Sequence, residues 1–153
     1  MNLVERFQAY AEDFERTFAD DDWSRLEQYF TEDAAYSTTA NGLRVEGRGA
    51  VFAVLQASVS SFDRRCSTRT LVTTHGPQAR GNEVHREWSA KFTLEGAPDI
   101  EIRGSERAVF DGDRIRLLEV TMTPETLSRL MSYAATHLLP RTSRSKLCCG
   151  PRA

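Results

Sequence analysis

Two ionisable side chains fall on neighbouring predicted strands, where both would face the interior. Segments 83–95 and 100–110 alternate apolar and polar residues. This alternation puts Arg86 on the same face of its strand as Trp88, and Glu106 on the inward face of the next strand. A carboxyl among apolar groups favours its protonated form and can serve as a general acid or base. If Glu106 instead pairs with Arg86, the pair favours the ionised carboxylate. These two interpretations, one catalytic and one structural, predict opposite protonation states.

A pocket is expected around this pair. Its other predicted members are aromatic, aliphatic or hydroxyl-bearing side chains: Tyr10, Phe14, Tyr36, Thr38, Trp88, Ala90, Leu118, Val120 and Met122. An apolar wall with a few hydrogen-bonding groups suits a small, mostly hydrophobic ligand. The alternative is that these side chains simply fill the interior.

The sequence gives no indication of a metal or cofactor. Its histidines and cysteines stand at no metal-ligand spacing: His75, His85, His137, Cys66, Cys148 and Cys149. Gly47-Arg48-Gly49 lacks the length and the following lysine of a phosphate-binding loop. We therefore expect neither a metal nor a cofactor, and reduced thiols.

The length, composition and net charge of the chain limit the class of protein to which these residues can belong. A chain of 153 residues with 40% hydrophobic and 27% charged residues fits one globular domain. The net charge of −2 creates no field that would attract nucleic acid or anionic lipid. No apolar run is long enough to span a bilayer and no signal pattern opens the chain, so we expect a cytoplasmic protein.

Helices and strands are predicted from the spacing of apolar residues. Helical spacing covers 3–19, 23–31, the stretch from Val51 to Val59, and 124–138. Strand composition covers 34–39, 67–75, 83–95, 100–110 and 114–123. The order helix, helix, strand, helix, four strands, helix predicts an α+β domain.

The last four strands are predicted to form an antiparallel meander, because short turn signals separate them: Gly76-Pro77, Gly96-Ala97-Pro98-Asp99 and Asp111-Gly112. In the final strand we place Leu118, Val120 and Met122 inside, whereas a shift of one residue would bring in Leu117, Glu119 and Thr121 instead. The opposite sheet face is polar, with His85, Glu87, Lys91, Arg103 and Arg107. Such a face meets water or a second subunit.

The end of the chain divides into a helix and a tail. Thr123 is a plausible helix cap with Pro124 at the first helical position, and Leu127, Leu130 and Met131 of this helix would close the pocket. We assign 1–139 to the domain and 140–153 to a basic, flexible tail, because the tail has too little apolar content to pack.

Several stretches resemble the NTF2-like superfamily and its SnoaL-like branch. They are Asp22-Trp23, Phe30-Thr31-Glu32-Asp33-Ala34, Gly47-Arg48-Gly49-Ala50-Val51 and Phe110-Asp111-Gly112-Asp113-Arg114-Ile115. The resemblance covers about residues 3–138. It implies a cystatin-like cone, in which a strongly curved antiparallel sheet wraps the N-terminal helices around a cavity, with an extra C-terminal helix. It also implies a homodimer formed through the outer sheet face.

The superfamily includes ketosteroid isomerases, whose pattern needs a tyrosine, an aspartate base and a protonated acid. Laid over this sequence, that pattern puts Phe14 at the tyrosine, Thr38 at the base and Glu106 at the acid. Phenylalanine donates no hydrogen bond, and a threonine hydroxyl is too weak a base at neutral pH. The isomerase reaction is therefore disfavoured.

Two further reactions of the superfamily also lack their residues. Epoxide hydrolases of this fold use two aspartates and an arginine, and here Arg86 matches the arginine while Trp88 and Val120 stand at the acids. Polyketide cyclases carry an aspartate near the end of the last strand, and residues 120–123 contain no acid. We therefore expect a protein that binds a small hydrophobic molecule. The alternatives are an isomerase, hydrolase or cyclase that uses Glu106 with Arg86, and a protein-interaction module.

Overall fold

The computed structural model describes residues 2–138, so the predicted tail at 140–153, with Cys148 and Cys149, lies outside the described residues. Its helical elements are α1 (Leu3–Asp20), η1 (Trp23–Tyr29), α2 (Arg48–Ser61), η2 (Asp63–Arg65) and α3 (Pro124–His137). Its strands are β1 (Phe30–Thr38), β2 (Arg44–Glu46), β3 (Thr68–Arg80), β4 (Glu83–Thr93), β5 (Ile100–Asp111) and β6 (Arg114–Met122). No helix among these is both long and apolar enough to cross a membrane.

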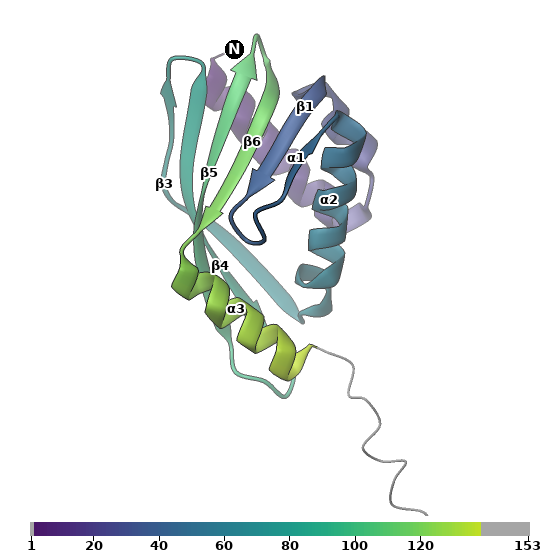
Figure 1. The fold of residues 1–153 in the computed structure, drawn as a ribbon, viewed down its shortest axis with the longest axis vertical. Coiled ribbons are helices and arrows are strands. Elements are labelled where there is room, and N and C mark those ends of the chain that lie inside the picture. Colours follow the sequence, from purple (N-terminus) through teal and green to yellow (C-terminus); the bar gives the residue numbers. More distant parts are fainter. Residues whose placement is uncertain (1, 139–153) are drawn as a thin grey trace, which may run out of the picture.

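The strands form one curved six-stranded sheet in the order β2-β1-β6-β5-β4-β3, with α1 behind it, α2 beside β1 and α3 at the lower end of the sheet (Figure 1). The predicted antiparallel meander is confirmed for β3 to β6. The predicted α+β fold with a curved sheet is confirmed, with the one difference that the sheet is not antiparallel throughout, because β1 runs parallel to β6. The sheet is therefore mixed, within an α+β fold.

Cross-strand pairing confirms the predicted inner faces. Arg86 stands opposite Glu106 in the β4–β5 pair, and Glu106 stands opposite Val120 in the β5–β6 pair. Because side chains that stand opposite each other share a sheet face, the inner set of β6 is Leu118, Val120 and Met122, and the alternative register does not occur.

Strand β3 continues where a turn was predicted. Gly76-Pro77 lies inside β3, where the register against β4 shifts, and the chain reverses only after Arg80. Gly76 has φ +79°, and a Cβ there would lie 2.7 Å from the carbonyl oxygen of His85. Glycine is required at this irregularity because both the backbone conformation and the close approach exclude a side chain.

The first half of the chain departs from prediction at two points. The second helix is a 3₁₀ helix that ends at Tyr29, so Phe30 and Thr31 open β1 rather than close a helix. Asn41-Gly42 lies in the short hairpin that joins β1 to β2. Strand β2 itself was not predicted. β2 has only three residues, too few for a visible alternation of apolar and polar positions.

The two long terminal helices begin as predicted. Asn2 and Glu5 form a capping box at α1, and the Thr123 hydroxyl accepts a hydrogen bond of 3.2 Å from the Thr126 amide at α3. Pro124 occupies the first turn of α3. Satisfying these orphan amides fixes where each helix starts and which face turns to the sheet.

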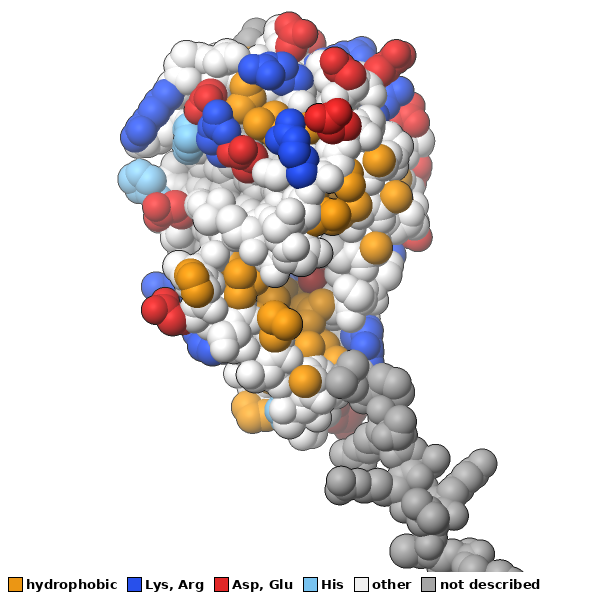
Figure 2. Space-filling view, in the orientation of Figure 1, with side chains coloured by type: hydrophobic (Ala, Val, Ile, Leu, Met, Phe, Trp, Pro, Cys, Tyr) orange, Lys and Arg blue, Asp and Glu red, His pale blue; other side chains and the backbone are white. Residues whose placement is uncertain are grey.

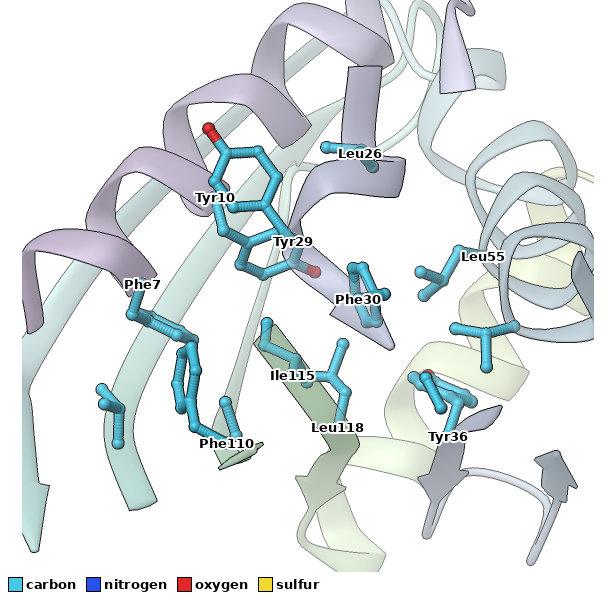
Figure 3. Close-up of a cluster of buried hydrophobic side chains, with 14 residues drawn as sticks. Phe7, Tyr10, Leu26, Tyr29, Phe30, Tyr36, Leu55, Phe110, Ile115 and Leu118 are labelled. Atoms are coloured by element: carbon cyan, nitrogen blue, oxygen red, sulfur yellow. The ribbon is translucent and has the colours of Figure 1, made fainter. Parts of the chain in front are cut away.

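The interior divides into two apolar clusters. The larger cluster draws on α1, η1, β1, α2 and β6, including Phe7, Phe30, Leu55 and Ile115 (Figure 3). The smaller cluster lies against α3 and contains Trp88, Phe92, Ile100, Ile102 and Tyr133.

Candidate ligand-binding cavity

A cavity of about 580 Å³ lies between the two apolar clusters and takes lining residues from both. All eleven residues predicted for the site line it: Tyr10, Phe14, Tyr36, Thr38, Arg86, Trp88, Ala90, Glu106, Leu118, Val120 and Met122. They come from α1, β1, β4, β5 and β6, so the curvature of the sheet brings them together. The volume falls in the range of small-molecule sites, roughly 300–1,000 Å³.

Arg86 and Glu106 form an ion pair inside this cavity. The Arg86 Nε atom donates a hydrogen bond of 2.9 Å to Glu106 Oε2, and Nη2 donates to the same oxygen. The two side chains are only 11% and 13% exposed, and the guanidinium lies 5.2 Å from the centre of the Phe7 ring. The geometry is therefore that of the paired carboxylate. Within residues 2–138, Glu106 Oε1 receives no hydrogen bond.

Two phenols lie near the pair. Burial, and then the charge of Glu106, raise the pKa of Tyr10 well above its usual value. Burial also raises the pKa of Tyr36, with a smaller contribution from Glu106, while a hydrogen bond with Thr38 opposes the shift. Both side chains therefore stay neutral at physiological pH and offer hydroxyl groups to the cavity.

A second charged group lines the cavity and was not predicted. Arg69 of β3 donates from Nη1 to Glu15 of α1 at 2.6 Å and from Nε to Asp63 of η2 at 2.8 Å. Its side chain is 6% exposed and its guanidinium lies 4.6 Å from the centre of the Phe18 ring. Burial raises the pKa of Asp63, with Arg69 opposing the shift.

Sequence reasoning could have found only part of this second group. Alternation in β3 puts Arg69 on the inner face with Leu71, which was visible in the sequence. Glu15 and Asp63 lie 54 and 6 residues away from Arg69 on other elements, and no local pattern connects them to it.

Trp88 forms part of the cavity wall because Gly104 leaves room for it. These residues stand opposite each other on β4 and β5. A Cβ at position 104 would lie 2.5 Å from Cζ2 of the indole and 2.9 Å from the carbonyl oxygen of Thr121. The indole therefore occupies the space that a side chain at position 104 would need.

The predicted closure by α3 is confirmed at one residue. Leu130 lines the cavity, and Leu127 is half-buried. Met131 is 67% exposed and does not line the cavity, so its predicted role is wrong. One α3 side chain, rather than an apolar face, borders the opening.

The remaining reactive groups stay apart from the cavity chemistry. His75 lies within β3 rather than at a strand end. On the outer face, the Nε2 atom of His85 lies 3.0 Å from Oε2 of Glu83. Burial raises the pKa of the Cys66 thiol, which lowers its reactivity. Over residues 2–138, no group of three or more His, Cys, Asp and Glu side chains is arranged to hold a metal.

Comparison with known proteins gives structural likeness without sequence likeness. No protein-family model matches the chain, and no curated protein is similar to it in sequence. An NTF2-like protein of unknown function from Burkholderia pseudomallei K96243 superposes with a TM-score of 0.63 at 10% identity, over 84% of this chain and 96% of that one.

Two further solved structures superpose equally well. TerC, co-crystallised with polyporic acid, has a TM-score of 0.62 at 12% identity, over 84% of this chain and 97% of its own. A SnoaL-like protein from Shewanella denitrificans OS-217, a candidate polyketide cyclase, has a TM-score of 0.61 at 18% identity, over 82% of this chain and 96% of its own. The chain therefore has the NTF2-like fold.

Proposed function

We propose that this protein binds a small, largely hydrophobic molecule in the cavity. The observation that carries the proposal is a largely apolar cavity that contains the Arg86–Glu106 ion pair, with Glu106 Oε1 receiving no hydrogen bond from residues 2–138. Apolar walls provide affinity, and a few placed polar groups provide orientation. TerC, which shares the fold, was crystallised with a small organic molecule, which supports the proposal without identifying the ligand.

Native mass spectrometry of protein purified from its own host tests this proposal. We expect a mass above that of the polypeptide that returns to the polypeptide mass on denaturation, and the released molecule can then be identified. An unliganded protein whose crystal structure shows side chains filling the space would contradict the proposal.

A second candidate function is catalysis by Glu106 as an acid or base with Arg86 as the charge stabiliser. It is favoured by Glu106 Oε1, which receives no hydrogen bond from residues 2–138, and by the fact that Glu106 and Tyr10 line the same cavity. The ketosteroid isomerase reaction remains disfavoured, because Thr38 cannot act as the base and a carboxylate paired with arginine donates no hydrogen bond. Replacing Glu106→Gln separates the functions: catalysis predicts lost turnover with retained binding, whereas a structural pair predicts lost stability.

A further part of the proposal concerns the partner that the protein binds through its outer sheet face. We propose a homodimer through the outer sheet face, where charges of both signs gather at the end of the sheet far from α3 (Figure 2). On this face Arg107 forms ion pairs with Glu83 and Glu119, so side chains of opposite charge lie next to each other there. A cytoplasmic location stays a prediction, and an interaction role for the tail concerns residues outside those described.

A further inference from the structure

We infer that the ligand presents a hydroxyl group to Glu106, and that the site selects a hydroxyl over a carboxylate, a ketone or an ether. This inference rests on the proposed function, because it names the class of molecule that the same cavity takes. It follows from the hydrogen-bonding groups that the cavity leaves unused.

The first of these groups is an acceptor. Glu106 lines the cavity, and both hydrogen bonds from Arg86 end on its Oε2 atom, so Oε1 has no donor from the described part of the chain. A hydrogen bond to an ionised carboxylate oxygen is stronger than one to a neutral oxygen, so a ligand that covers this atom gains most by offering it a donor. A ketone or an ether cannot supply the missing proton, whereas a hydroxyl can.

The second group is a donor. Tyr10 is only 3% exposed and lines the cavity, yet its hydroxyl has no hydrogen-bond partner among residues 2–138. Tyr10 and Glu106 line the same cavity, and the charge of Glu106 contributes to the raised pKa of the phenol. A ligand hydroxyl between them would donate to Glu106 Oε1 and accept from the Tyr10 hydroxyl, so one small group would satisfy both.

The charge balance of the cavity argues against an anionic ligand. The lining contains three carboxyls, on Glu15, Asp63 and Glu106, and two guanidiniums, on Arg69 and Arg86. Each guanidinium is already paired, so a ligand carboxylate would add a negative charge to a site that has an excess of acid. A neutral hydroxyl avoids this repulsion.

Isothermal titration calorimetry with three probes of one ring system tests the inference: 2-naphthol, 2-methoxynaphthalene and 2-naphthoate. We expect 2-naphthol to bind at least about tenfold more tightly than either of the others, because a hydrogen bond to a charged group is worth at least that much. Tyr10→Phe should reduce this preference several-fold. Tyr29→Phe is the matched control, because the Tyr29 hydroxyl donates to Asp13 and does not line the cavity.

The double replacement Arg86→Met with Glu106→Leu removes the polar pair without leaving a lone buried charge. It should abolish the preference while the hydrophobic probe still binds. Equal binding of 2-naphthol and 2-methoxynaphthalene to the unaltered protein would overturn the hydroxyl inference and leave the proposed function standing. If none of the three probes binds, the proposed function fails as well.

Discussion

The Arg86–Glu106 pair stabilises the protein only while both partners are present. Removing one charge leaves the other buried without compensation, which is more damaging than removing both. We predict that Arg86→Met lowers the free energy of unfolding by about 3 kcal/mol. We expect the double variant Arg86→Met with Glu106→Leu to recover most of this loss. Urea denaturation followed by circular dichroism measures the difference, and a double variant less stable than the single one would contradict a simple ion pair.

Gly104 and Trp88 set the shape of the cavity wall at a single contact. An alanine methyl at position 104 would overlap the indole, so we predict that Gly104→Ala tilts Trp88 into the cavity. The expected cost is about 1–3 kcal/mol, as for other overpacked cores, together with weaker probe binding. The matched control is Gly49→Ala in α2, where a new methyl meets nothing within 4 Å. Equal binding by both variants would contradict this role of Gly104.

Single residues were predictable where strand alternation decided their position. The inner sets of β4, β5 and β6 follow from a period of two, so the wall around Arg86 and Glu106 could be read from the sequence. The contact from Arg69 to Glu15 could not, because it depends on how α1 lies against β3. Likewise, the sequence shows that Arg86 and Glu106 share a face, but not that Oε1 is left free.

Among the elements, strands β4, β5 and β6 are joined on the outer face by one charged network. Arg107 of β5 donates hydrogen bonds to Glu83 of β4 and to Glu119 of β6. Hydrogen bonds from Arg107, and then from His85, lower the pKa of Glu83 from 4.5 to about 2. Ionised Glu83 therefore favours the folded state.

The pH dependence of stability follows from this shift. Because the folded pKa of Glu83 is depressed, its contribution is fully present above pH 4.5 and is lost as the pH falls toward about 2. We predict that Glu83→Gln flattens the fall in the free energy of unfolding across this window, measured by urea denaturation at stepped pH. Glu87→Gln is the control on the same face, since no arginine within residues 2–138 pairs with Glu87. If the two variants gave the same profile, Glu83 would not be the group responsible.

Elements were predictable where their apolar pattern repeats several times without interruption. The long helices α1 and α3 and the strands β4 to β6 carry enough repeats of their pattern to be recognised. The three-residue β2 does not, and β1 begins in residues whose helical spacing was misleading. In β3, Gly76-Pro77 has the composition of a turn but forms an irregularity inside the strand, because β4 continues to pair on both sides of it.

For the whole molecule, the fold sets the position of the cavity but not what enters it. The solved structures that superpose are at most 18% identical in the three comparisons given above, so they share the fold alone. The distinguishing features are residues of this chain: a Glu106 oxygen and a Tyr10 hydroxyl that have no hydrogen-bond partner among residues 2–138, and the excess of acidic groups around Arg69.

The oligomeric state is tested best at the centre of the outer sheet face. Ser105 of β5 stands there between Glu87 of β4 and Thr121 of β6. In a two-fold symmetric dimer a central residue faces its own copy, so Ser105→Lys would place two like charges together. We predict a dimer for the unaltered protein and a monomer for this variant by size-exclusion chromatography with light scattering. Ser128→Lys on exposed α3 should stay dimeric, and a monomeric unaltered protein would refute the dimer.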